Sequence, residues 1–285
     1  MIQSNESEAP FKMPAPLPAM RRIGSRIELH SLVDSTNGSA FDAAAAGAPD
    51  GTVIVAEAQR AGRGRLGRRW HSPTGCNLYL SILLRGPFPR PVLTGLPFLA
   101  AVAARDAVGD VAGLIPRVKW PNDLFINDRK VGGILVEARS GGGETALAVV
   151  GIGVNVNWPN RAMPDELRAT ATSLESELGR PLDRPALLAA LMGRFDRGYG
   201  RLRDEGAAWL IEEWSRSCLT LGRMVTVETA SGPLTGLAEA VEPGGHLLLR
   251  HADGSTSRLS VDATTRLRPS GTQVPMTGAT HALRD

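Results

Sequence analysis

The stretch "RVKWPNDLFINDRKVGGILVEA" (residues 117–138) contains the pattern that decides the fold. Within it, "RVKW" and "LFIN" resemble strand ends, "NDRK" has the composition of a polar hairpin turn, and "VGGILVEA" is an apolar returning strand. A glycine-rich turn, "SGGGE" (140–144), leads to another buried strand, "TALAVVGIGVNVN" (145–157). We therefore predict a β-hairpin that is followed by a further buried strand.

The flanking sequence adds helices and more strands. Residues 26–58 predict a strand, a capping cluster at 34–37, an alanine-rich helix that ends at Gly47, and a buried strand. Residues 77–86 predict an apolar strand, and helices are expected at 95–110, 184–203 and 206–216. Because strands and helices mix without strict βαβ alternation, the pattern favours an α+β fold over a doubly wound one.

Composition divides the chain into four parts. Residues 1–20 carry four prolines and little periodic apolar pattern, which predicts a disordered tail. Residues 21–218 are expected to form the catalytic domain. Residues 219–269 hold four or five short strands between Ser-Gly-Pro, Pro-Gly-Gly and Asp-Gly turns, which predicts a small barrel. Residues 270–285 are predicted to form a second disordered tail.

Charge and cysteine content exclude several classes of protein. With 32 basic and 29 acidic residues the net charge is only +3, so no general basic field points to nucleic acid or to an anionic membrane. Two cysteines are too few for a disulfide framework, and no signal peptide is evident. No apolar stretch is expected to reach the roughly 20 residues of a membrane span. A reducing cytoplasm is the expected location.

A loop with five arginines and three glycines, "QRAGRGRLGRRW" (59–70), follows the buried strand "GTVIVAEA". Glycine lets backbone N–H groups approach an anion closely, and arginine offers paired hydrogen bonds to phosphate or carboxylate. The loop could equally be solvated, or bind RNA as Gly-Arg repeats do. Its position between two apolar strands fixes both its ends inside a folded domain.

A second basic constellation favours anion binding. Lys119 and Lys130 flank the hairpin, and Asn122 and Asp123 follow Pro121. Each has an ordinary structural role when taken alone. Together with the arginine loop, two lysines and an acid able to hold a divalent cation are what nucleotide chemistry at a carboxylate requires. The histidines are scattered, without metal-ligand spacing, and are expected to be structural.

Five motifs, in this order and spacing, resemble the biotin protein ligases: "STN" (35–37), "QRAGRGRLGRRW" (59–70), "LYLS" (78–81), "KWPNDLFINDRKVGGILVE" (119–137) and "GIGVNVN" (151–157). The resemblance is strong over residues 28–158 and looser up to residue 268. It implies a mixed-sheet ligase domain with a C-terminal SH3-like barrel. It also implies a biotin-[acetyl-CoA-carboxylase] ligase that uses ATP and Mg²⁺ to make biotinyl-5′-AMP and then biotinylates a lysine of a biotin carboxyl carrier domain.

The resemblance also implies roles for individual residues. The catalytic residues would be Lys130, Arg65, Lys119 and Asp123, with Asp123 also on the Mg²⁺ side. Biotin would be bound by Ser35, Thr36, Asn37, Gln59, Gly62, Arg63, Arg65, Lys130, Gly133 and Gly151. ATP would be bound by Arg63, Arg65, Arg68, Trp70, Lys119, Asn122, Asn155 and Arg268, with Trp70 near the adenine.

Several alternatives stay open. Ser35 or Asn37 could only cap the helix, and Asn155 could only end a strand. A lipoate ligase or octanoyltransferase would share the fold, with Cys76 as a nucleophile, although a small buried thiol is the favoured role of Cys76. Because no helix-turn-helix precedes Ile23, we expect a ligase without repressor function and no nucleic-acid or membrane partner. The sequence leaves open whether the protein is a homodimer.

Overall fold

A computed structural model of the chain describes residues 22–141, 144–261 and 264–273. The tail predicted at 1–20 lies outside the described residues, as does most of the one predicted at 270–285. Residues 270–273 belong to a strand, so the last folded element extends beyond the predicted boundary at residue 269.

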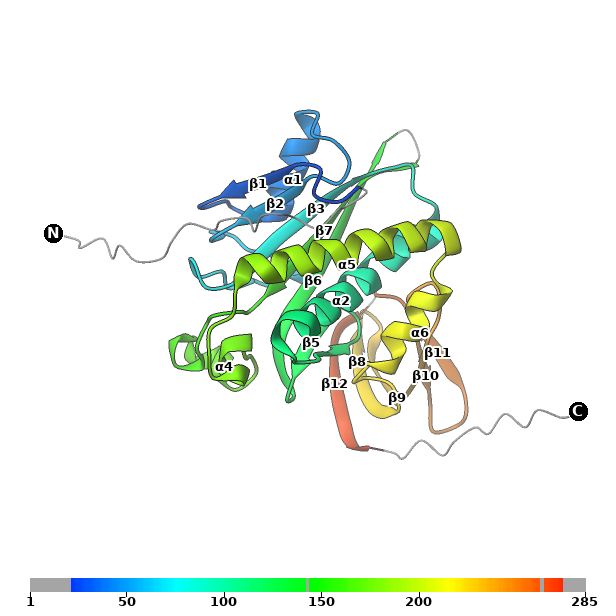
Figure 1. Cartoon of the computed structure of the whole chain (residues 1–285). Coiled ribbons are helices and arrows are strands. Elements are labelled where there is room, and N and C mark those ends of the chain that lie inside the picture. Colours follow the sequence, from blue (N-terminus) through cyan, green and yellow to red (C-terminus); the bar gives the residue numbers. More distant parts are fainter. Residues whose placement is uncertain (1–21, 142–143, 262–263, 274–285) are drawn as a thin grey trace, which may run out of the picture.

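The larger sheet has seven strands and is mixed, as the α+β prediction requires (Figure 1). Its first two strands pair in parallel and all other neighbours are antiparallel. In spatial order the strands are β1 (Ile27–His30), β2 (Val53–Ala56), β3 (Leu78–Arg85), β7 (Glu144–Val154), β6 (Arg129–Gly141), β5 (Asp123–Ile126) and β4 (Arg117–Lys119).

Helices cover both faces of this sheet. The long helices α2 (Arg90–Ala112) and α5 (Arg184–Glu205) pack together across one face, and α1 (Thr36–Ala45) packs on the other. Side chains on neighbouring strand positions point to opposite faces. Thus Ile82 belongs to the apolar cluster under α2 and α5, whereas Leu83 packs with Phe41 of α1.

Shorter helices complete the part of the fold around the larger sheet. These are α3 (Asp165–Arg168), α4 (Leu174–Leu178), α6 (Ala208–Arg216) and the 3₁₀ turns η1 (Arg65–Gly67) and η2 (Asn160–Ala162).

The hairpin was predicted correctly. Its tip is Asn127–Asp128, whose φ angles of 48° and 59° lie in the left-handed region that Asn and Asp tolerate best among non-glycine residues. Arg129 and Lys130 already belong to β6, so the reactive lysine candidate lies on a strand rather than in a mobile turn.

The prediction that no apolar stretch reaches the length of a membrane span was wrong for α2. By length and composition this 23-residue helix passes that test. However, 72% of its most apolar window is buried inside the fold, where it packs on α5 and the sheet. Its apolarity is explained by its position as the central core helix.

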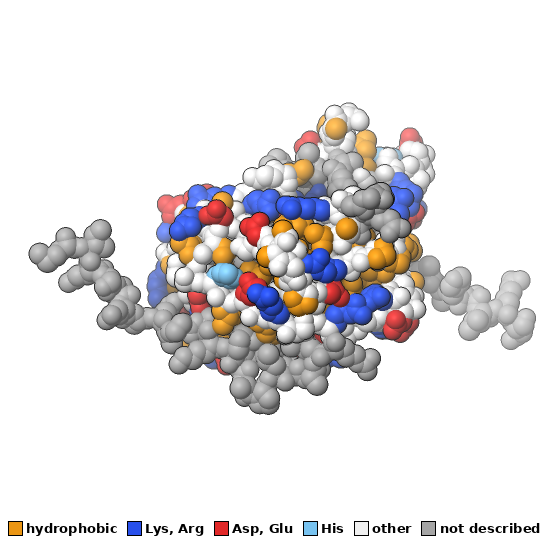
Figure 2. Space-filling view, turned by 90° about the horizontal axis from the view of Figure 1, so that it is seen from above, with side chains coloured by type: hydrophobic (Ala, Val, Ile, Leu, Met, Phe, Trp, Pro, Cys, Tyr) orange, Lys and Arg blue, Asp and Glu red, His pale blue; other side chains and the backbone are white. Residues whose placement is uncertain are grey.

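A second, antiparallel sheet of five strands follows residue 222. In spatial order it contains β11 (Thr256–Leu259), β10 (Leu247–Arg250), β9 (Gly232–Val241), β8 (Arg223–Thr229) and β12 (Thr264–Gln273). Its inward side chains, such as Val227 and Leu249, join the same apolar cluster as α2 and α5. On the face drawn in Figure 2, basic and acidic side chains are interspersed with apolar ones, as the small net charge suggests.

Candidate active site

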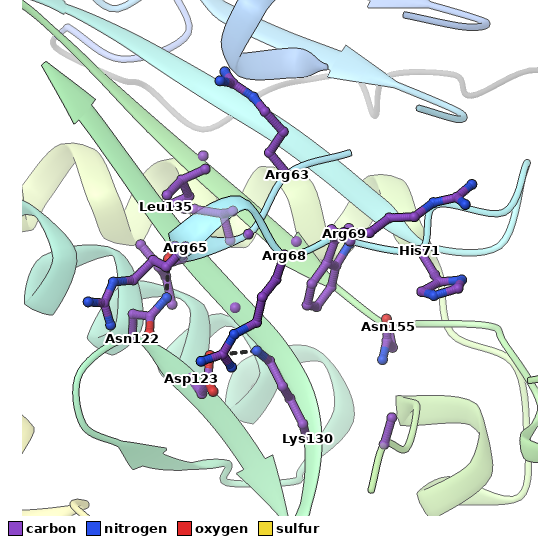
Figure 3. A pocket seen from close by; sticks show the side chains of 18 of the residues that line it. Arg63, Arg65, Arg68, Arg69, His71, Asn122, Asp123, Lys130, Leu135 and Asn155 are labelled. Atoms are coloured by element: carbon purple, nitrogen blue, oxygen red, sulfur yellow. Dashed lines mark hydrogen bonds and ion pairs between the residues drawn. The ribbon is translucent and has the colours of Figure 1, made fainter. Parts of the chain in front are cut away.

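A cavity of about 590 Å³ lies on the α1 face of the larger sheet. This volume is in the range of small-molecule sites. The start of α1, the arginine loop, β4 to β7 and the segment around residue 170 surround it (Figure 3). The cavity brings together most of the residues that the sequence singled out: Ser35, Thr36, Asn37, Gln59, Arg63, Arg65, Arg68, Trp70, Lys119, Asn122, Asp123, Lys130, Gly133, Gly151 and Asn155.

Two predicted residues are placed differently. Gly62 does not line the cavity. It packs closely against the end of the arginine loop, where an added Cβ would lie 2.6 Å from the Trp70 carbonyl oxygen. Arg268 pairs with Thr226 in the second sheet, and its side chain lies outside the described residues. Its neighbour Leu267 does line the cavity, so this strand passes close to the site.

Lys130 projects into the cavity from β6. Its Nζ lies 2.6 Å from Asp123 Oδ1 and 5.4 Å from the centre of the Trp70 ring. Lys119 lies nearby with its Nζ 5.1 Å from the centre of the Phe125 ring. Both lysines and Asp123 are half-buried, so their charges act on a ligand in a medium that screens less than bulk water.

The arginine loop is a compact hairpin-like turn. The N–H of Gly64 donates to Arg68 O at 2.7 Å, and the N–H of Trp70 donates to Gly62 O at 2.8 Å. Leu66 at its tip has a φ of 58°, is 52% exposed, and carries the backbone strain of a left-handed non-glycine residue.

The arginines of this loop diverge. Arg68 extends toward Lys130 and Asp123, whereas Arg63 and Arg69 point away from them (Figure 3). Arg63 pairs with Glu137 at 2.9 Å between Nη2 and Oε2. Arg65 donates from Nη2 to Val261 O at 2.5 Å, a contact between the loop and the segment that precedes β12. For Arg63 to meet an anion beside Lys130, it must leave Glu137.

Trp70 lies directly on the sheet because two glycines make room for it. A Cβ on Gly153 would lie 2.8 Å from the indole Cε2, and one on Gly133 would lie 3.3 Å from Cζ3. Larger residues at these positions would displace the ring, which forms part of the cavity wall.

The start of α1 forms a buried polar wall. Ser35 is at the N-cap position, but its side chain makes no capping hydrogen bond, and Asn37 bonds across to β6 instead. Ser35 therefore occupies the predicted cap position without a capping side chain, and the capping interpretation of Asn37 was wrong. Gly151 must be glycine, because a Cβ there would lie 2.2 Å from Asn37 Oδ1.

Asn155 is 4% exposed and donates from Nδ2 to Thr172 O at 3.0 Å. Asn155 directly follows the end of β7 and also lines the cavity, so it can serve both as a strand end and as a ligand contact.

Several residues of the site were not predicted from the sequence, and four of them have clear contacts. Gly153 supports Trp70, His71 lines the cavity, and Ser81 and Glu137 bond to Asn37. Ser81 and Glu137 end the motifs "LYLS" and "ILVE", so their polarity after an apolar run was the available signal.

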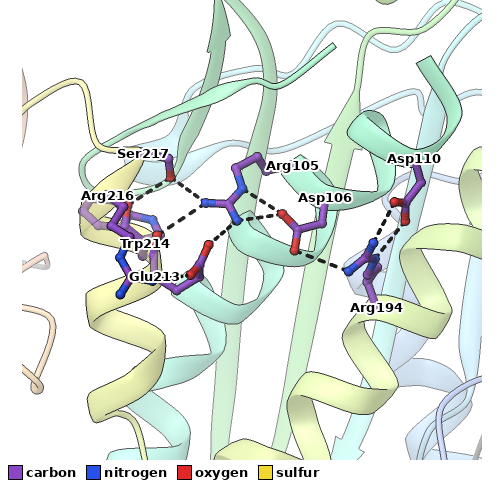
Figure 4. Close-up of polar contacts among 8 residues, drawn as sticks. All are labelled: Arg105, Asp106, Asp110, Arg194, Glu213, Trp214, Arg216 and Ser217. Atoms are coloured by element: carbon purple, nitrogen blue, oxygen red, sulfur yellow. Dashed lines mark hydrogen bonds and ion pairs between the residues drawn. The ribbon is translucent and has the colours of Figure 1, made fainter. Parts of the chain in front are cut away.

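An ion-pair network joins helix α2 to helices α5 and α6 (Figure 4). The buried guanidinium of Arg105 lies 2.6 Å from Glu213 Oε1 and 2.8 Å from Asp106 Oδ1, and its hydrogen bond holds the pKa of the Glu213 carboxyl below its usual range. Arg105 also donates to Ser217 Oγ at 2.9 Å. The segment after α6 then runs beside β4, where Trp120 N donates to Thr220 Oγ1.

Trp120 is buried between the two sheets. Its Nε1 donates to Gly245 O at 3.2 Å, in the turn between β9 and β10. The second sheet therefore holds the segment from Lys119 to Asp123 in place.

No group of three or more potential metal ligands from His, Cys, Asp and Glu occurs among the described residues. Asp123, the predicted Mg²⁺ ligand, is bonded to Lys130. This donor set fits a Mg²⁺ ion that arrives with nucleotide phosphates, because such ions are bound through one or two carboxylates and otherwise by phosphate oxygens and water.

The cysteines play no visible part in this cavity. Cys76 is half-buried, packs against the cluster of Trp158, Met163 and Ala171, and does not line the cavity; Cys218 is buried. Burial raises the pKa of the Cys218 thiol.

Comparison with known proteins agrees with the geometry. Residues 29–155 match the biotin/lipoate A/B protein ligase family. The bifunctional ligase/repressor BirA of Bacillus subtilis is 34% identical over 240 residues, covering 84% of this chain and 74% of that protein. The biotin-[acetyl-CoA-carboxylase] ligase of Paracoccus denitrificans is 34% identical over 78% of this chain and 92% of its own length.

A solved structure, the biotin protein ligase from Aquifex aeolicus in complex with biotin and ATP, superposes with a TM-score of 0.75 at 28% identity, covering 86% of this chain and all of that one. The chain thus belongs to the biotin protein ligase family.

Proposed function

We propose that this protein is an ATP-dependent biotin-[acetyl-CoA-carboxylase] ligase. The observation that carries the proposal is one cavity with two chemically different ends: a buried polar wall at the start of α1 and a cationic end around Lys130. The first suits a ureido ring, and the second suits a carboxylate next to a phosphate chain. Both substrates also occur in the solved relative from Aquifex aeolicus.

The residues divide between the two ends. Ser35, Thr36, Asn37, Gln59 and Gly151 would hold the ureido head of biotin, with Gly62 and Gly133 supporting the walls. At the other end Lys130, Arg63, Arg65 and Arg68 would neutralise the carboxylate and the α-phosphate. Lys119, Asn122, Asn155, Trp70 and Arg268 would bind the nucleotide.

The first step joins two anions. A carboxylate oxygen of biotin attacks the α-phosphorus of ATP, the bond to the β-phosphate oxygen breaks, and pyrophosphate leaves with the electron pair. Fixed positive charges lower this barrier because they are already oriented toward the developing charge. Lys130, held by Asp123 and the Trp70 ring, is the best placed of them. Mg²⁺ bound through Asp123 would add charge neutralisation on the phosphate chain.

The product is a mixed anhydride, which requires an amine acceptor. The Nζ of a carrier lysine attacks the biotinyl carbonyl carbon, and AMP leaves. We propose a biotin carboxyl carrier domain as this acceptor, since the family transfers biotin to such lysines. The protein would work in the cytoplasm, where its free cysteines stay reduced.

For the domain organisation we propose residues 21–218 as the catalytic domain and the second sheet as an SH3-like barrel. The hydrogen bond from Trp120 to Gly245 and the contact of Arg65 with Val261 support a role of this sheet at the nucleotide end.

A lipoate ligase or octanoyltransferase is the second candidate, because the matched family includes lipoate ligases. Two observations favour biotin. The cavity wall at the start of α1 carries buried amide and hydroxyl groups, and an apolar dithiolane or alkyl chain offers no hydrogen bond to the Ser35 and Thr36 hydroxyl groups there. Cys76, the nucleophile that the octanoyltransferase interpretation needs, lies outside the cavity lining.

The loop provides a test of this function. Arg63, Arg68 and Arg69 are exposed, so trypsin can reach them. We expect biotin with ATP to slow tryptic cleavage between residues 62 and 70 by about tenfold, because phosphate pairing holds these side chains in the site. Lipoate with ATP should protect much less. Equal cleavage rates with and without biotin and ATP, measured by mass spectrometry of the peptides, would refute the assignment of this loop.

A further inference from the structure

A continuous row of hydrogen bonds runs behind the cavity wall at the start of α1. Glu137 Oε2 accepts from Asn37 Nδ2 at 2.7 Å, and Asn37 Oδ1 lies 2.6 Å from Ser81 Oγ. Ser81 Oγ in turn lies 2.8 Å from Thr36 Oγ1. Asn37, Ser81 and Thr36 are at most 5% exposed, and only Thr36 and Asn37 of the four residues line the cavity.

Two acceptors set the direction of this row, and Glu137 is the nearer of them. Glu137, which pairs with Arg63, accepts from Asn37 Nδ2 at 2.7 Å, and the Leu135 backbone oxygen accepts from the same nitrogen at 3.3 Å. The amide of Asn37 therefore turns its NH₂ toward Glu137 and its oxygen toward Ser81. A hydroxyl group has a single proton. Ser81 therefore donates to Asn37 and must accept at its contact with Thr36.

The hydroxyl group of Thr36 has one proton to donate. Its proton goes to Ser81 at 2.8 Å rather than to Gln59 Oε1 at 3.3 Å. Gln59 Oε1 is meanwhile held by the backbone N–H of Thr36 at 2.9 Å. The remaining lone pairs of Thr36 Oγ1 are thus available at the cavity wall, where the oxygen acts as an acceptor.

We propose that Glu137 is a positioning residue that polarises this row, so that Thr36 presents a hydrogen-bond acceptor to a ureido N–H of biotin. This inference rests on the proposed function, because it assigns the chemistry of the same site. Glu137 acts through Asn37 and Ser81 and touches neither substrate.

Glu137 has a second contact that could act instead. Its Oε2 also accepts from Arg63 Nη2, so removing the charge alters the arginine loop as well. Ser81 separates the two routes, because Ser81→Ala interrupts the row but leaves the contact between Glu137 and Arg63 intact.

The test compares Glu137→Gln and Ser81→Ala with wild type in biotin-dependent pyrophosphate exchange. Glu137→Gln keeps the shape but can donate as well as accept, so only the longer bond from Asn37 to the Leu135 oxygen still sets the direction of the row. We expect both variants to raise the KM for biotin by about tenfold, the size of one lost hydrogen bond to a polarised partner. In Ser81→Ala, which leaves the pair of Arg63 and Glu137 intact, kcat and the KM for ATP should stay within about twofold of wild type. Glu205→Gln, which removes an exposed ion pair on α5, is the control and should behave as wild type.

A second measurement tests whether the Thr36 hydroxyl oxygen is the acceptor. Wild type should reject biotin methylated on a ureido nitrogen, and both variants should lose about tenfold of that discrimination. Unchanged discrimination in either variant, or a KM effect in Glu137→Gln that is absent in Ser81→Ala, overturns the proposal. A wild-type protein without biotin-dependent exchange would instead overturn the proposed function.

Discussion

Lys130→Ala should abolish adenylation, lowering kcat of biotin-dependent pyrophosphate exchange by about a thousandfold or more. Lys130 holds a fixed positive charge beside Asp123 and Trp70, where carboxylate and α-phosphate are brought together, and no alanine variant can neutralise the charge that develops there. The fold should persist, because the Lys130 side chain is 32% exposed and the Asp123 side chain that it leaves behind is 25% exposed, so water can solvate the remaining charge.

The neighbouring residue gives a matched control. Arg129 lies on the same strand, but its side chain pairs with Glu177 at 2.7 Å and it does not line the cavity. Arg129→Ala should therefore keep the rate of exchange within a few-fold of wild type, because Arg129 contacts no reacting group. Pyrophosphate exchange that continues at the wild-type rate in Lys130→Ala would remove this lysine from the mechanism.

Gly153→Ala should reduce kcat/KM for the same exchange by about a hundredfold, because a shift of about 1 Å in a positioning group has effects of that size. The added Cβ would lie 2.8 to 2.9 Å from three atoms of the Trp70 indole, and the backbone of β7 is fixed by strands on both sides. The indole must therefore move, and the part of the cavity wall that contacts the Lys130 ammonium group moves with it. Stability should fall by about 1–3 kcal/mol from overpacking.

Gly200→Ala in α5 controls for the change of a glycine to alanine. A Cβ there meets nothing within 4 Å, so alanine should preserve activity and stabilise the helix by up to about 1 kcal/mol. If Gly153→Ala is as active as Gly200→Ala, Trp70 does not shape the site.

The parts of the fold that the sequence predicted well depend on local preferences. The hairpin at Asn127–Asp128 needs left-handed backbone, which Asn and Asp supply, and the apolar runs of β3 and β7 are long enough to identify them as buried strands. The arginine loop and the lysines were found for a similar reason, because charge on a short segment between apolar strands is visible without knowledge of the fold.

The rest depends on pairs that are distant in sequence. The contact of Trp70 with Gly153, and those of Asn37 with Ser81 and Glu137, join segments between 44 and 100 residues apart. Local pattern suggested a helix cap for Asn37, but the tertiary contact with Glu137 turned its side chain toward the sheet. For α2, apolarity alone could not separate a core helix from a membrane span, because both bury the same side chains.

The most direct test of the function is pyrophosphate exchange by the full chain with biotin, lipoate and octanoate, each measured separately with ATP and Mg²⁺. A buried polar wall at the other end of the cavity from Lys130 predicts that biotin supports exchange. Lipoate and octanoate should be at least about a hundredfold less effective, because their apolar ends cannot donate a hydrogen bond to the Thr36 hydroxyl oxygen. Exchange with lipoate or octanoate that equals or exceeds exchange with biotin would contradict the account.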